Sequence, residues 1–123
     1  MEQQKIRTYR DLGMWQKSIN MVTEIYRVTK HFPKQQTFGL VLQIKKSSIS
    51  IPCNIAEGYG RYSNKEFIRF LSIAIGSLSE MQTQPQISLN LGYISVDNYQ
   101  ILNENSREIE RMLSSLIRKL KNK

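Results

Sequence analysis

The chain has 123 residues, the length of one domain, and it is long enough to bury a hydrophobic core without disulfides. Hydrophobic residues make up 40% and charged residues 23%, which argues against a largely disordered chain, and no apolar stretch approaches the ~20 residues of a membrane-spanning helix. Eighteen Lys and Arg residues against ten Asp and Glu residues give a net charge of +8, which favours nucleic acid or an acidic protein as a partner.

Apolar residues recur every three or four positions in four stretches, so we predict helices at approximately residues 11–31, 37–57, 64–91 and 96–121. Asp11 is the expected N-cap of the first helix, and Pro33 ends it because the residue before a proline avoids the helical region. The stripe of this helix consists of Leu12, Trp15, Ile19, Val22 and Tyr26.

The second helix is apolar on two nearly opposite sides, which is more than one bundle stripe requires. One interpretation is that the helix lies deep in its own bundle. The other, which we favour, is that a second copy of the chain covers one of the two sides. The residues that we assign to this oligomer interface are Leu40, Ile44, Ile51 and Ile55.

The third helix opens with Ser63 and Glu66 at the spacing of a capping box and closes near Gly92. The fourth carries apolar residues at helical spacing from Leu102 to Leu120. Because the connections are short, the sequence predicts an all-α, antiparallel, up-down-up-down four-helix bundle that forms one domain over residues 1–123.

Catalytic chemistry has few candidate residues in this sequence. His31 is the only histidine, and no Glu-x-x-His pair of a di-iron bundle is present. Cys53, the only cysteine, excludes a disulfide framework, suits a reducing cytoplasm and is predicted to be a packed thiol. We therefore expect no catalytic residue, no metal and no cofactor, and we expect a cytoplasmic protein.

Basic residues are arranged in a pattern that suits phosphate contact. Arg107, Arg111 and Arg118 lie opposite the apolar stripe of the fourth helix, although a solvated face with Glu–Arg pairs would have the same pattern. Tyr59 and Tyr62 stand beside a second basic cluster, where they either stack on bases or pack at the helix junction. The residues assigned to nucleic-acid binding are Arg107, Arg111, Arg118, Lys119, Lys121, Arg61, Lys65, Arg69 and Lys46.

Several runs of residues together resemble a known family. The runs are Asp11-Leu12, Trp15-Gln16-Lys17, Phe38-Gly39-Leu40, Ala74-Ile75-Gly76-Ser77-Leu78-Ser79-Glu80 and, above all, Ser50-Ile51-Pro52-Cys53-Asn54-Ile55-Ala56-Glu57-Gly58-Tyr59-Gly60-Arg61. The chain resembles the four-helix bundle family encoded in intervening sequences of bacterial large-subunit ribosomal RNA genes, also called the S23 ribosomal protein family. That family is similar to the accessory variability protein of diversity-generating retroelements.

The resemblance implies a homopentamer without known catalysis that takes part in nucleic-acid binding. An alternative function is a structural or adaptor bundle whose basic face binds an acidic protein such as a reverse transcriptase, and an enzyme is the third hypothesis. Lys45 and Lys46 stand where the family has arginines, and Pro85 stands where it has a leucine, so we expect the third helix to bend or break there. We also predict that Asn54, Glu57 and Arg61 form a polar network at the turn between the second and third helices.

Overall fold

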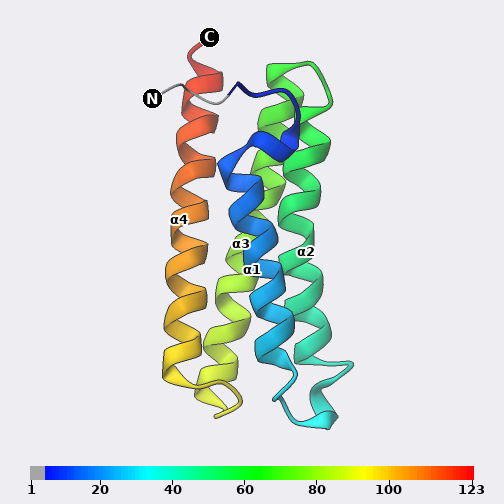
Figure 1. Cartoon of the computed structure of the whole chain (residues 1–123), viewed down its shortest axis with the longest axis vertical. Coiled ribbons are helices and arrows are strands. Elements are labelled where there is room, and N and C mark those ends of the chain that lie inside the picture. Colours follow the sequence, from blue (N-terminus) through cyan, green and yellow to red (C-terminus); the bar gives the residue numbers. More distant parts are fainter. Residues whose placement is uncertain (1–4) are drawn as a thin grey trace.

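The computed structural model describes residues 5–123, which form a bundle of four antiparallel helices (Figure 1). The helices are α1 (Gly13–Thr29), α2 (Leu40–Tyr59), α3 (Asn64–Asn90) and α4 (Val96–Lys121), and two 3₁₀ turns, η1 (Tyr9–Asp11) and η2 (Lys34–Gln36), precede α1 and α2. Each helix packs against two others, α1 against α2 and α4, and α3 against α2 and α4. The all-α bundle predicted from the sequence is therefore confirmed.

The first helix begins two residues later than predicted, because Asp11 caps the 3₁₀ turn η1 and not α1. Its carboxylate accepts hydrogen bonds from the backbone N–H groups of Arg7 (2.9 Å) and Thr8 (3.1 Å), which closes a capping box around η1. Leu12 is the N-cap of α1 instead and offers no side-chain cap. The two backbone N–H donors, followed by the charge of Arg7, lower the pKa of Asp11 below its ordinary value of 3.8.

The core lies along the bundle axis and contains the side of α2 that we had assigned to an oligomer interface. Ile44, Ile51 and Ile55 are at most 1% exposed, and Leu40 is partly buried against the same core. The interface prediction for these four residues is therefore wrong, because they face the core of the same chain, where α2 packs against α1 and α3. The opposite side of α2, which includes Ile49 and Cys53, remains exposed.

Two prolines lie inside helices without ending them. Pro52 in α2 and Pro85 in α3 are both buried, and each helix is continuous through its proline. We expected α3 to bend or break at Pro85, and the structure shows that it does not break there. A proline removes one backbone hydrogen bond from the helix, and the buried Pro85 ring lies beside Leu102 of α4 in the α3–α4 contact.

The contact between α2 and α3 is close because Gly58 has no side chain. A Cβ atom at this position would lie 2.7 Å from the Cβ of Phe70 and 3.0 Å from Cδ1 of Phe67. The last turn of α2 therefore rests directly on the first turns of α3, which sets the position of the short α2–α3 turn. Among residues 5–123, no helix is long and apolar enough to cross a membrane.

Candidate nucleic-acid interface

Three segments that are distant in the sequence meet at one end of the bundle: η1 with the residues before it, the α2–α3 turn, and the last turns of α4 (Figure 1). We call this the cationic end. Among residues 5–123, its acidic residues are Asp11, Glu57 and Glu66, which are fewer than its basic ones and are each engaged in a cap or an ion pair. The basic residues of the cationic end are Lys5, Arg7, Arg10, Arg61, Lys65, Arg69, Arg118, Lys119, Lys121 and Lys123.

A row of exposed arginines on α4, Arg107, Arg111 and Arg118, leads from the middle of the bundle to the cationic end, and we call it the arginine ridge. Among residues 5–123, none of the three forms an ion pair. Glu108 instead pairs with Lys17 of α1 at 3.0 Å, and Glu110 accepts a hydrogen bond from Gln82 of α3. The Glu–Arg pairs that would have made this a self-neutralised surface are therefore not formed, and the guanidinium groups face solvent.

The basic residues beside the α2–α3 turn are held in place by the ring of Phe70. The guanidinium carbons of Arg61 and Arg69 lie 5.0 Å and 4.6 Å from the ring centroid, within cation–π distance. Arg61 also pairs with Glu57, and Arg69 pairs with Glu66 at 3.1 Å. The structure therefore brings Arg61 and Arg69 together around one aromatic ring.

The two tyrosines at this turn differ in their surroundings. Tyr59 packs edge-on against Phe67, with ring centroids 6.1 Å apart, as expected for an aromatic residue at a helix junction. Tyr62 is 99% exposed, and its backbone has a positive φ of 56°. Only one of the two rings is therefore available to a partner.

The polar network that we predicted from Asn54, Glu57 and Arg61 is divided in the structure. Glu57 and Arg61 form an ion pair one helical turn apart. Asn54 donates instead to the carbonyl (2.7 Å) and hydroxyl (2.9 Å) of Ser50, which in turn hydrogen-bonds to Ser77 of α3 at 2.8 Å. Asn54 therefore belongs to an α2–α3 contact in the middle of the helix, not to the turn.

Two lysines of α2 lie apart from the cationic end. Lys46 is exposed in the first half of α2, toward the opposite end of the bundle, so the structure does not group it with the other predicted binding residues. Lys45, which is partly buried in the first half of α2, has its ammonium nitrogen 4.4 Å from the ring centroid of Tyr26. This cation–π contact explains how the charge is accommodated there.

Comparisons with known proteins agree on one family. The sequence profile of the 23S rRNA-intervening sequence protein family matches residues 10–115. The chain belongs to this family. A crystal structure of a protein of unknown function from the S23 ribosomal protein family of Bacteroides thetaiotaomicron is similar, with 30% sequence identity and a TM-score of 0.79. The similarity covers 85% of the present chain and 97% of that protein. No curated protein matches the chain.

In this intervening sequence protein, the basic residues that sequence reasoning missed are those near the first helix. Arg10 lies 5.6 Å from the ring centroid of Tyr9 and 5.7 Å from that of Trp15, and Lys5 and Arg7 precede it at the same end. Their charge was visible in the sequence, but nothing in the local pattern indicated that they join the distant turn and the end of α4. Only the antiparallel packing brings them together.

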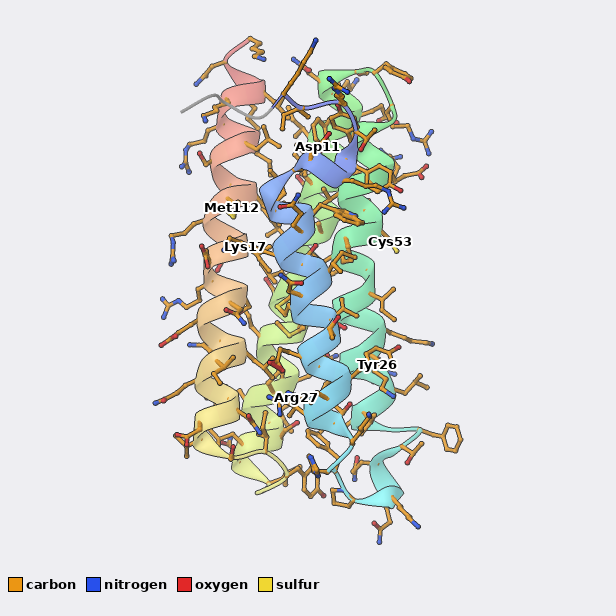
Figure 2. The ribbon with its side chains drawn as sticks, viewed as in Figure 1. Asp11, Lys17, Tyr26, Arg27, Cys53 and Met112 are labelled. Carbon is orange, nitrogen blue, oxygen red and sulfur yellow. The ribbon has the colours of Figure 1, made fainter. Side chains whose placement is uncertain are left out.

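The intervening sequence protein also exposes an apolar groove between α1 and α2. It has a volume of about 290 Å³, and Cys53, which projects from the outer side of α2 (Figure 2), is one of its lining residues. The prediction that Cys53 is a packed thiol is wrong, since it is exposed on the side of α2 away from the core. The groove is lined by Tyr9, Trp15, Ile19, Val22, Ile49, Pro52, Cys53 and Ala56.

Proposed function

We propose that this intervening sequence protein is a non-enzymatic nucleic-acid-binding protein that holds phosphate groups at its cationic end and along the arginine ridge. The observation that carries the proposal is the convergence of basic residues from three chain segments at one end of the bundle. The acidic residues of that end within residues 5–123 are few and form caps or ion pairs, which supports a positive field there.

The guanidinium groups suit this task for a chemical reason. Arginine presents forked donors with a permanent charge, which match the oxygens of a phosphate in a bidentate geometry. Arg107 and Arg111 are exposed, and neither forms an ion pair among the described residues, so a phosphate need not displace a carboxylate to reach them. Each phosphate contact releases counterions and adds ~0.7 to ~0.9 to the slope of log affinity against log salt.

The test is fluorescence anisotropy with a labelled RNA hairpin and the matching DNA hairpin over a range of salt concentrations. The triple variant Arg118→Gln, Lys119→Gln, Lys121→Gln is expected to bind more weakly and to reduce the salt slope by about 2. The matched control removes the same charge at the other end of the bundle through Lys30→Gln, Lys34→Gln and Lys46→Gln, and it should keep most of the slope.

Three outcomes would contradict the proposal. If the wild-type protein binds neither hairpin at low salt, it is not a nucleic-acid-binding protein. If both triple variants lose affinity equally, the cationic end is not the binding site. If the protein captures an acidic protein that remains bound after nuclease treatment, while binding no nucleic acid, the adaptor function is correct instead.

We further propose that copies of the chain associate through the apolar groove between α1 and α2, and the family resemblance implies five copies. Ile19 and Ile49 are 37% and 38% exposed there, and association would remove them from water. Ile49→Lys should reduce the assembled mass measured by light scattering, because burial of its ammonium group is costly. Ile73→Lys, on the exposed surface of α3 (42%), is the control. A wild-type protein that is monomeric at micromolar concentration would refute the association.

A further inference from the structure

We infer that Tyr62 stacks on an unpaired base, so that the cationic end takes single-stranded nucleic acid or a loop in preference to a fully paired duplex. The inference rests on the proposed function, because it names the form of nucleic acid that the same end would bind. Its basis is the juxtaposition of a fully exposed aromatic ring with three basic side chains at the α2–α3 turn.

The position of Tyr62 has no explanation in the stability of the fold. Its side chain is 99% exposed, whereas Tyr59, three residues earlier, is half-buried and packs against Phe67. The backbone of Tyr62 lies in the left-handed region, with φ of 56°, which disfavours a bulky residue. Glycine or asparagine adopts this backbone conformation more readily, so tyrosine at this position destabilises the turn and its ring makes no packing contact in return. Unfavourable backbone conformations of this kind are concentrated at positions that bind a ligand or partner.

Basic residues flank Tyr62 along the chain, before it at the turn and after it in the first turns of α3. Arg61 precedes Tyr62 directly, Lys65 follows in the first turn of α3, and Arg69 lies one turn further along α3. Arg61 and Arg69 are tied to the ring of Phe70, which limits the directions in which they can point. When a base stacks on Tyr62, the neighbouring phosphates of the same strand could therefore bind these basic side chains.

The ion pairs of Arg61 and Arg69 do not prevent phosphate contact. The side chains of both pairs are substantially exposed, 45% and 54% for Arg61 and Glu57, and 56% and 38% for Arg69 and Glu66. Pairs that are this exposed contribute little, since water competes with both partners. A phosphate that brings two or three oxygens can exchange with the carboxylate.

Stacking also explains why the preference should be for unpaired bases. The faces of bases in a continuous duplex are covered by their neighbours, whereas an unpaired base exposes a π-face to an aromatic side chain. Stacking depends weakly on base identity, so the preference concerns the strand form and not a sequence. Phosphate contacts from lysines and arginines would by themselves bind both forms.

The experiment compares a single-stranded oligoadenylate that carries a fluorescent adenine analogue with a blunt duplex of the same length. Tyr62→Asn removes the ring while keeping a residue that tolerates a positive φ. It is expected to weaken single-strand binding about tenfold and to remove the quenching of the analogue, with duplex affinity and salt slope unchanged. Tyr62→Phe is the matched control and should retain both affinity and quenching, because its ring also stacks.

The inference is overturned if Tyr62→Asn binds and quenches the single strand like the wild type, or if it weakens both forms equally. A changed assembled mass in Tyr62→Asn would show that the ring is a subunit contact and would also overturn it. These results are distinct from failure of the proposed function, in which the wild type binds neither probe. The thermal stability of Tyr62→Asn should equal or exceed that of the wild type, which confirms that the variant is folded.

Discussion

Replacement of Gly58 by alanine tests the close approach of α2 and α3 on which the α2–α3 turn depends. In an exposed helix, alanine is more favourable than glycine by about 1 kcal/mol. At Gly58 the new Cβ would lie 2.7 Å from the Cβ of Phe70, well inside the ~3.5–4.0 Å of an ordinary carbon–carbon contact. The Cβ of Phe70 is fixed to the backbone of α3 and cannot rotate away, so the two helices must separate.

Such overpacking typically costs about 1–3 kcal/mol. After the gain in helix propensity of about 1 kcal/mol, we expect Gly58→Ala to lower the free energy of unfolding by up to about 2 kcal/mol. Gly76→Ala is the matched control, because Gly76 lies inside α3 with no atom within 4 Å of its added Cβ. This variant should be more stable than the wild type by about 1 kcal/mol.

The assay is urea denaturation followed by far-ultraviolet circular dichroism, with all proteins at one concentration because association shifts the midpoint. Both variants make the same change to the unfolded chain and gain the same helix propensity, so the difference between them of about 1–3 kcal/mol reports the packing at Gly58. If Gly58→Ala were stabilised as much as Gly76→Ala, the helices would not be in close contact there, and the reasoning would be refuted.

Three further changes test other parts of the structure. Asp11→Asn should destabilise the protein at neutral pH and have the same stability as the wild type well below pH 3.8. Backbone N–H donors lower the pKa of Asp11, so the stabilisation by its carboxylate is lost as the pH falls through that lowered value. Denaturation across acidic pH measures this, and a constant difference would contradict it. Ile51→Ala should lower the free energy of unfolding by about 2–5 kcal/mol at every protein concentration, because Ile51 is fully buried within one chain. A loss of stability that disappears on dilution would show that Ile51 lies in a subunit interface. Lys45→Met should cost less than about 1 kcal/mol through loss of the contact with Tyr26, and a larger cost in thermal denaturation would point to a further partner of the ammonium group.

The helices of this protein were predictable because their signals are local. The period of apolar residues, the Ser63 cap and the short connections lie within a few residues of one another, and each has the same consequence in any bundle. Asp11 shows where local reasoning fails. It is a good N-cap in type, but Thr8 stands three residues earlier, and the pair closes a capping box one turn before the helix.

The candidate site was predictable only in its components. The sequence identified the arginines of α4 and the cluster around Arg61, but it did not indicate that Arg7 and Arg10 join them. It also left open which tyrosine of the turn is free, since Tyr59 and Tyr62 have the same chemistry. That choice depends on whether Phe67 lies against the ring.

The sequence by itself determined the class of the protein: four amphipathic helices, a positive charge and the family to which the chain belongs. Only the tertiary structure decided which of the two apolar sides of α2 faces inward, because both sides have helical spacing and nothing within the helix distinguishes them. The choice depends on the neighbouring helices: α2 packs against α1 and α3 with Ile44, Ile51 and Ile55 in the core, while Ile49 remains 38% exposed. Hydrophobic burial is non-directional, so it favours a buried side without specifying which one.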